Sequence, residues 1–193
     1  KSLEYCETNF GKYPNKTLRF AEISNFTRGF AATAYPATIF INERQFHLNL
    51  SQSEGQGVIN ELAGHELSHQ WWGNNAQMSP AYREGRGILI ETLAQYTQLM
   101  LFKNEYGQTK MLEMVQLHQD LYDSGKAFSG EEPLYTSNPN NANVIYNKGL
   151  VKMYELYLLI GEEKINLALK NLLVKHKFPL QPPTSLDLID ELK

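Results

Sequence analysis

Two histidines and a glutamate near the middle of the chain have the spacing of a metal site. His65 and His69 are four residues apart, and Glu66 directly follows the first histidine. On a helix, residues four apart lie on the same face, so both imidazoles can bind one ion. Glu66 is rotated to one side of that pair, where its carboxylate can reach a water on the metal. The His-Glu-x-x-His spacing is typical of zinc sites at which an activated water attacks a carbonyl.

A catalytic zinc site needs a third protein ligand, which must come from another part of the chain. The candidates downstream are Glu84, Glu91 and Glu105. Glu84 lies in a segment rich in glycine and arginine, and Glu105 would lie about 20 Å beyond Glu91 along a helix. Glu91 has apolar neighbours, among which an ionised carboxylate is costly unless it is paired or bound to a metal. We therefore choose Glu91, although an acidic residue also favours a helix N-terminus without any metal.

Two helices must position these three side chains. The pattern predicts one helix over 58–72 and another over 88–106, each followed by a glycine. The alternative for the first is a surface helix with two solvated histidines. The adjacent tryptophans Trp71 and Trp72 argue against that alternative, because they would bury the end of the helix.

The rest of the pattern predicts an α+β fold, with a small N-terminal sheet followed by a mostly helical half. Alternating residues predict strands over 18–23, 38–41 and 46–50, with a loop over 25–35 between the first two. Helical spacing and glycine stops predict a helix that ends at Gly11 and further helices over 108–123, 144–160 and 162–175. Thr184 and Asp187 have the spacing of a capping box and begin a last helix. We interpret His47 as a structural or solvated side chain, and His118 as a surface side chain rather than a metal ligand.

Length and composition set further limits on the function. The 193 residues suffice for a single domain with its own core, in which 1–50 form the sheet part and 51–193 the helical part. The net charge of −3, without a basic run, argues against a nucleic-acid partner. No segment reaches ~18 uninterrupted apolar residues, the length that spans a bilayer. The chain starts at Lys1, and we expect a piece of a longer protein whose other parts could carry a membrane segment.

The segment His-Glu-Leu-Ser-His-Gln-Trp-Trp-Gly-Asn, residues 65–74, resembles the catalytic segment of the aminopeptidase N and leukotriene hydrolase family, which belongs to the gluzincins. The phrase Leu-Ile-Glu-Thr-Leu-Ala-Gln-Tyr around Glu91 is similar to the phrase that holds the family's glutamate ligand. Glu91 lies three positions beyond Ile88, which stands at the family's usual spacing. The resemblance implies a thermolysin-like zincin catalytic domain that binds one zinc ion through His65, His69 and Glu91. It also implies hydrolysis of a peptide bond, with Glu66 as general base.

Two further phrases of the family bear on the mechanism. The segment Ile-Tyr-Asn-Lys-Gly matches the family's Tyr-x-Lys-Gly phrase, and the resemblance implies that Tyr146 stabilises the oxyanion. The family also has a Gly-Ala-Met-Glu-Asn phrase, whose glutamate anchors the free amino terminus of the substrate. The region that matches by context is 28–33, where Ala32 stands in place of that glutamate. We therefore expect a zinc metallopeptidase and leave aminopeptidase specificity open.

The tryptophan pair and the phrase around Glu91 look like a divergent branch of the family that is fused to ABC-transporter-type membrane proteins. The main hypothesis is a zinc peptidase with a peptide as its substrate. The alternative is a catalytically weak or inactive peptidase-like domain that binds a peptide or a partner within a larger membrane protein, on its extracytoplasmic side. A purely structural zinc is least favoured, because such sites usually have four protein ligands.

Overall fold

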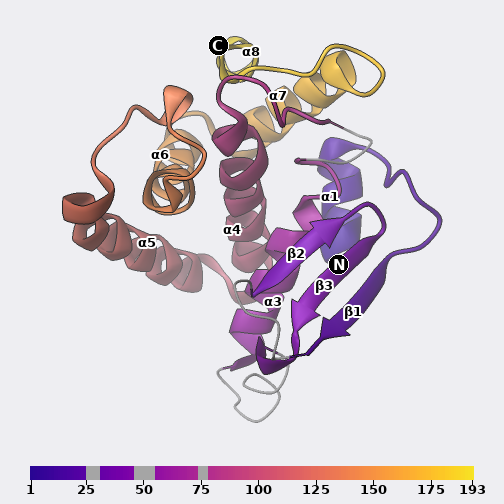
Figure 1. The fold of residues 1–193 in the computed structure, drawn as a ribbon, viewed down its shortest axis with the longest axis horizontal. Coiled ribbons are helices and arrows are strands. Elements are labelled where there is room, and N and C mark those ends of the chain that lie inside the picture. The colour runs from indigo at the N-terminus through magenta and orange to yellow at the C-terminus, as the bar shows by residue number, and fades with distance from the viewer. Residues whose placement is uncertain (25–30, 46–54, 74–77) are drawn as a thin grey trace.

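The structure, a computed structural model, describes residues 1–24, 31–45, 55–73 and 78–193. It has an α+β fold, with a small N-terminal sheet followed by a mostly helical part, as predicted (Figure 1). The helices, in chain order, are α1 (Ser2–Phe10), α3 (Gly55–Ser68), α4 (Leu93–Tyr106), α5 (Gln108–Ser129), α6 (Gly149–Ile160), α7 (Glu162–His176) and α8 (Ser185–Glu191). Two π-helical turns, η1 (Ile88–Thr92) and η3 (Asn143–Lys148), run directly into α4 and α6, and a short 3-10 helix, η2 (Leu134–Thr136), precedes η3.

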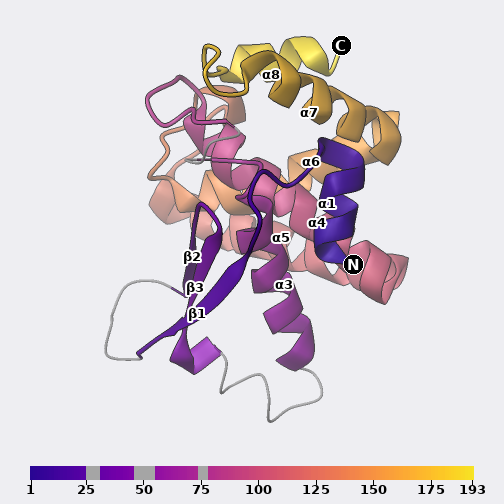
Figure 2. The ribbon, with the colours of Figure 1, turned by 90° about the vertical axis from the view of Figure 1, so that its right-hand side faces the viewer.

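The sheet contains β1 (Arg19–Ile23), β2 (Ala32–Tyr35) and β3 (Thr38–Asn42) in the order β1-β3-β2. The central strand β3 pairs in parallel with β1 and antiparallel with β2. In both ribbon views the sheet lies beside α3, and β2, an edge strand, contacts this helix (Figures 1 and 2). The prediction of a loop over 25–35 is wrong for its last four residues, because they pair with β3 as β2. The predicted strand 46–50 lies outside the described residues.

The helix α4 lies at the centre of the helical part and packs against α3, α5 and α6 (Figure 1). Every residue from Leu93 to Met100 is buried. A helix that is buried on all sides forms the core of a molecule rather than one of its surfaces. Residues on α4 are therefore held rigidly, which makes this helix a suitable support for a site.

The two tryptophans that follow α3 connect it to its neighbours, and both are fully buried. The indole N–H of Trp72 donates to Thr97 Oγ1 on α4 at 2.9 Å. The indole N–H of Trp71 donates to the carbonyl of Gly11 at 2.8 Å, just after α1. The predicted burial at the end of this helix is thus confirmed, although α3 itself ends at Ser68 and the tryptophans lie in the following turn.

Among the remaining predicted helices, the end of the one that corresponds to α5 needs a correction. The helix predicted to end before Gly125 continues to Ser129 as α5. A Cβ atom at Gly125 would lie 2.6 Å from the side chain of Asn143, so this glycine allows η3 to pack closely against α5. The capping box of Thr184 and Asp187 at the start of α8 is confirmed.

None of the helices in the described ranges combines the length and the apolar character that crossing a membrane requires. The predicted division of a single domain near residue 50 stays a prediction.

Candidate active site

His65, His69 and Glu91 come together where α3 ends and η1 begins. His65 lies in the last turn of α3, His69 directly follows this helix, and Glu91 lies in η1. The two histidine Nε2 atoms are 3.2 Å apart, and Glu91 Oε2 lies 3.3 Å from Nε2 of His65 and 3.5 Å from Nε2 of His69. One ligand atom from each side chain lies within 4.8 Å of the others. The three side chains that the sequence suggested as ligands, Glu91 included, therefore lie close together.

Hydrogen bonds on the outer side of each imidazole fix which nitrogen faces that point. Nδ1 of His65 lies 3.0 Å from Gln95 Oε1 and 3.1 Å from Gln98 Oε1, both on α4. Nδ1 of His69 lies 2.9 Å from the carbonyl oxygen of Trp72. These partners are acceptors only, so each Nδ1 must carry a proton and donate it. In the neutral tautomer, both Nε2 lone pairs then point at the Glu91 carboxylate.

The arrangement fits a bound cation. Glu91 Oε2 is buried and has no hydrogen-bond partner, which is a costly state for an ionised oxygen. Burial by itself raises the pKa of Glu91, but His65 and His69 in their protonated forms outweigh it and hold that pKa well below its ordinary value. When both imidazoles are neutral, a cation bound between them and the carboxylate would stabilise the ionised carboxylate in the same way. Two imidazole nitrogens and one carboxylate oxygen are the ligand set of many catalytic zinc sites, which leave a fourth position open.

Glu66 lies beside the ligand cluster and is not part of it. It is buried, with 6% of its surface exposed, and it lines the same pocket as the two histidines. Burial raises the pKa of Glu66, and the neighbouring Glu91 raises it further against the opposing effect of the two histidines. A carboxylate with a raised pKa is a better proton acceptor, so Glu66 is suited to general-base chemistry.

Tyr146 reaches the pocket from η3. Its ring stacks on the imidazole of His65, with ring centroids 5.9 Å apart and an angle of 28° between the planes. Burial, followed by the nearby Glu91 carboxylate, raises the pKa of Tyr146 above its ordinary value. The phenol is therefore protonated at neutral pH and available as a hydrogen-bond donor.

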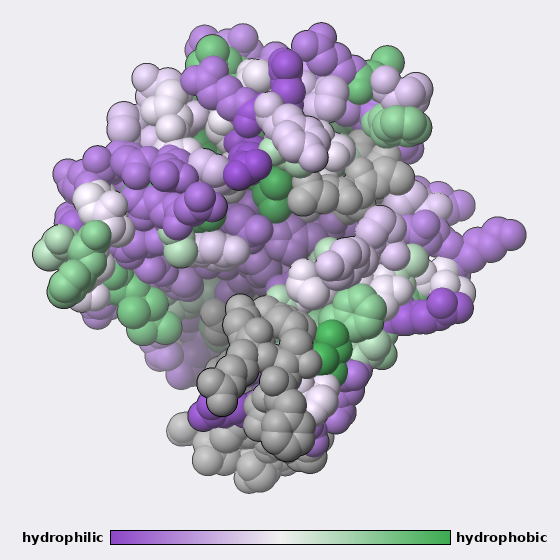
Figure 3. All heavy atoms as spheres, in the orientation of Figure 1, coloured by the Kyte–Doolittle hydropathy of each residue, from purple (hydrophilic) through white to green (hydrophobic). Residues whose placement is uncertain are grey.

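The pocket at this cluster has a volume of about 240 Å³. One wall is formed by the four residues of β2, and the others by His65, Glu66, His69, Ile90, Glu91 and Tyr146. Figure 3 shows that this face of the molecule is hollowed between the sheet and the helical part, with hydrophilic residues in the hollow. Ala32 does lie on the β2 wall, and no described residue of that wall carries a carboxylate. The only carboxylates among the described lining residues are Glu66 and Glu91.

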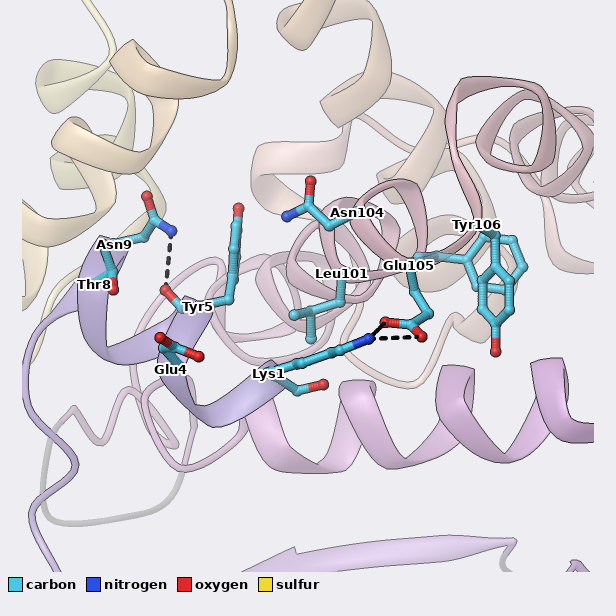
Figure 4. A pocket seen from close by; sticks show the side chains of 11 residues that line it. Lys1, Glu4, Tyr5, Thr8, Asn9, Leu101, Asn104, Glu105 and Tyr106 are labelled. Atoms are coloured by element: carbon cyan, nitrogen blue, oxygen red, sulfur yellow. Dashed lines mark hydrogen bonds and ion pairs between the residues drawn. The ribbon is translucent and has the colours of Figure 1, made fainter.

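The two rejected ligand candidates lie elsewhere. The carbonyl of Glu84 accepts a hydrogen bond from the backbone N–H of Ser185 at the start of α8. Glu105 pairs with the ammonium group of Lys1 at 3.1 Å, in a second cavity of about 610 Å³ between α1 and α4 (Figure 4). The described lining of that cavity contains no histidine, so it has no comparable ligand set.

His47 and His118 were also considered in the sequence, and the structure describes only His118. The prediction that His118 is a surface side chain is wrong, because it is buried on α5 and its Nδ1 lies 2.8 Å from Asn147 Oδ1 in η3. Its role is therefore structural, beside the turn that holds Tyr146. His47 lies outside the described residues.

The residues that support the site were not among those predicted from the sequence. Gln95 and Gln98 hold His65 from α4, and Thr92 joins the two π-helical turns. A signal was present for the glutamines, because two amides three residues apart on a helix of apolar residues imply buried partners. No signal was present for Thr92, because its partner lies 53 positions away in the chain.

Comparisons with known proteins show the family and the fold. The model of the peptidase family M1 domain matches residues 1–193. The M1 zinc metallopeptidase of Deinococcus radiodurans has a similar fold, with a TM-score of 0.68 and 18% identity over 100% of this chain and 39% of its own. Yeast LTA4 hydrolase is similar with a TM-score of 0.71 and 15% identity, over 99% of this chain and 30% of its own. The chain thus spans less than half the length of these two proteins.

Proposed function

The chain belongs to peptidase family M1, and from that premise we propose that it hydrolyses peptide bonds with a zinc ion held by His65, His69 and Glu91. The observation that carries the proposal is the convergence of these three side chains in a pocket that Glu66 and Tyr146 also line. Structural zinc sites usually have four closed ligands, whereas the described residues here supply three. The open fourth position favours catalysis.

Zinc bound at this position supplies a Lewis acid, which polarises a carbonyl and lowers the pKa of a bound water to about 7. The Glu66 carboxylate accepts the proton of the water that attacks the peptide carbonyl. The same carboxyl group then donates a proton to the leaving amine, so that the products are a carboxylate and an amine. The Tyr146 hydroxyl donates a hydrogen bond to the oxyanion that develops during the attack.

Aminopeptidase specificity is a finer part of the proposal. An exopeptidase of this kind needs a negative group that receives the free α-amine of the substrate. The described part of the β2 wall offers no carboxylate, and Glu66 and Glu91 already have other roles. Peptides with a free amino terminus and their N-acetylated counterparts should therefore be compared directly.

A second candidate function is a domain that binds a peptide or a partner without turnover, within a larger membrane protein related to ABC transporters. The binding function is favoured because the described residues of the β2 wall include no carboxylate, so the α-amine of a peptide substrate has no partner there. The buried Glu66, with its raised pKa, opposes it, because a binding domain has no need of a general base.

The experiment compares the zinc-loaded wild type with Glu66→Gln on a mixed library of free and N-acetylated peptides. We expect Glu66→Gln to bind zinc as the wild type does and to lose at least about 10²-fold in kcat, since general-base catalysis is worth ~10²–10⁴-fold. Equal turnover by both proteins would contradict the assignment of Glu66. Tight peptide binding by both, with no hydrolysis by either, would support the binding domain instead.

A further inference from the structure

The two π-helical turns hold Glu91 and Tyr146, two of the functional residues of the site. Glu91 lies in η1 and Tyr146 lies in η3, and each turn continues without a break into an α-helix. A π-helical turn is rare, accommodates an extra residue in a helix and frequently occurs at functional sites. These two turns also contact one another, although they are far apart in the sequence. The relative position of Glu91 and Tyr146 thus depends in part on this contact.

A short buried hydrogen bond lies at the centre of the contact. The hydroxyl of Thr92 donates to the carbonyl of Ile145 at 2.6 Å, and Thr92 is fully buried. Thr92 follows Glu91 in the chain, and Ile145 precedes Tyr146. The hydrogen bond therefore joins the immediate neighbours of the metal-ligand candidate and of the oxyanion donor.

Two glycines allow the turns to approach so closely. A Cβ atom at Gly149 would lie 2.5 Å from Thr92 Oγ1 and 2.8 Å from Thr92 Cγ2, closer than real side-chain contacts allow. A Cβ atom at Gly87 would lie 2.8 Å from Cγ2 of Ile145, at the other end of the same contact. A side chain at either position would push η3 away from η1, together with the Tyr146 ring that stacks on His65.

We propose that Thr92 and Gly149 are positioning residues, which act through Ile145 to hold the Tyr146 hydroxyl at the distance from the Glu91 ligand cluster that the oxyanion requires. The inference rests on the proposed function. A donor must lie within about 2.7–3.1 Å of the oxyanion, and an error of about 1 Å in placement can cost ~10²-fold in rate. A contact that sets the spacing of η1 and η3 is therefore a determinant of kcat, although neither residue touches the substrate.

The test uses the zinc-loaded protein and five variants: Thr92→Val, Thr92→Ala, Gly149→Ala, the double variant Thr92→Ala/Gly149→Ala, and Tyr146→Phe as reference. Thr92→Val and Gly149→Ala are also made in the Tyr146→Phe background. Three quantities are measured, namely kcat and KM on a cleaved peptide, affinity for a phosphinic peptide that mimics the tetrahedral oxyanion, and the zinc dissociation constant. Thr92→Val removes the hydrogen bond at nearly constant volume. Gly149→Ala introduces the clash, and Thr92→Ala removes both of the closest atoms from it.

We expect Gly149→Ala to lower kcat and phosphinic-peptide affinity by the same factor of up to ~10²-fold, with KM and zinc affinity unchanged. Thr92→Val should lower the same two quantities by a smaller factor. The double variant should recover part of the loss of Gly149→Ala, because the space is restored. When Tyr146→Phe is already present, neither substitution should lower kcat further, because the group that they position is gone.

A matched control is Ser185→Ala. The Ser185 hydroxyl also donates from a buried position to a backbone carbonyl, that of Tyr135 at 2.7 Å, away from the pocket. This variant should lower the melting temperature without changing the affinity for the phosphinic peptide. Gly149→Ala could fail to fold, in which case Thr92→Ala alone still decides the matter, since it removes the hydroxyl that lies 2.6 Å from the Ile145 carbonyl and puts no methyl group in its place.

The inference is overturned if the losses persist in the Tyr146→Phe background, or if zinc affinity falls together with kcat. It is also overturned if Thr92→Val and Gly149→Ala have the kcat and the phosphinic-peptide affinity of the wild type, while wild-type turnover depends on Glu66. In that case the proposed function survives. A wild type without turnover, but with phosphinic-peptide binding that depends on Tyr146, Thr92 and Gly149, would remove the proposed function and retain the inference.

Discussion

Burial raises the pKa of both Glu66 and Tyr146, with different consequences for the two side chains. It raises the pKa of Glu66, which makes the carboxylate a stronger proton acceptor. It also raises the pKa of Tyr146, and the Glu91 charge adds to that effect, which keeps the phenol protonated as a donor. One desolvated pocket thus provides a base and a neutral hydrogen-bond donor next to the same ligand cluster.

Replacing Tyr146 by Phe tests the donor alone. The substitution removes the hydroxyl and keeps the ring that stacks on His65, so the ligand cluster should remain in place. We expect kcat to fall by ~10²–10³-fold, the usual cost of one lost oxyanion donor. Zinc affinity should stay at the wild-type value, as measured by competition with a chelator. An unchanged kcat would exclude Tyr146 as the donor.

The glutamines on α4 provide a prediction about metal affinity. Gln95 Oε1 and Gln98 Oε1 both accept from the one Nδ1–H of His65, so either can replace the other. We expect Gln98→Met alone to change zinc affinity little. The double variant Gln95→Met/Gln98→Met leaves the N–H without an acceptor and should weaken zinc binding by ~10–100-fold, as lost outer partners of ligating histidines do. The same affinity in the double variant and the wild type would show that the amides do not orient His65.

At the scale of elements, local signals could be predicted from sequence and long-range contacts could not. The helix that carries His65 could be predicted from its own periodicity, although it ends at Ser68 rather than at Gly73, and Thr184 with Asp187 marks the start of α8 within three residues. The end of α5 could not be predicted, because Gly125 serves its contact with Asn143 rather than a helix end. The two π-helical turns also result from long-range packing. The longer spacing between His69 and Glu91 could be read from the sequence, but the π-helical turn that contains Glu91 could not be predicted from it.

The capping box of α8 provides a test of an element whose stability depends on pH. Asp187 Oδ2 accepts from the backbone N–H of Thr184 at 2.6 Å and from its hydroxyl at 2.7 Å. These hydrogen bonds, the backbone one first, lower the pKa of Asp187 below its ordinary value. A carboxyl group whose pKa is lower in the folded state stabilises that state while it is ionised.

Replacing Asp187 by Asn keeps an acceptor but removes the charge, and should therefore cost ~0.3–1 kcal/mol at pH 7, the usual contribution of a negative charge near a helix N-terminus. The stabilising effect of the ionised carboxylate is complete above the unfolded pKa of about 3.9 and is lost as the pH falls through the lower folded pKa. The difference between wild type and variant in urea unfolding should thus shrink at pH values below about 4. A constant difference across this range would mean that the charge of Asp187 contributes nothing.

For the whole molecule, the site lies where otherwise separate parts of the fold meet. The sheet provides one wall through β2, α3 provides His65, η1 provides Glu91, and η3 provides Tyr146. The buried helix α4 supports this junction, because it carries both glutamines and the threonine that receives the Trp72 indole. An ion bound at the junction would connect the end of α3 to the start of α4.

Zinc should consequently stabilise the folded chain, since a preformed ligand set is absent from the unfolded state. At a free zinc concentration of 100 times the dissociation constant, the stabilisation is about 2.7 kcal/mol, which corresponds to roughly 5–10 °C in Tm for a chain of this size. The measurement compares melting curves in zinc-buffered and chelator-containing solutions, followed by both helical circular dichroism and tryptophan signal. Glu91→Gln should lose most of the shift because it removes a ligand, whereas Glu66→Gln should retain it because that carboxylate lies outside the ligand cluster. A full shift in Glu91→Gln would mean that zinc stabilises the chain elsewhere, and an equal loss in both variants would mean that Glu66 is itself a ligand.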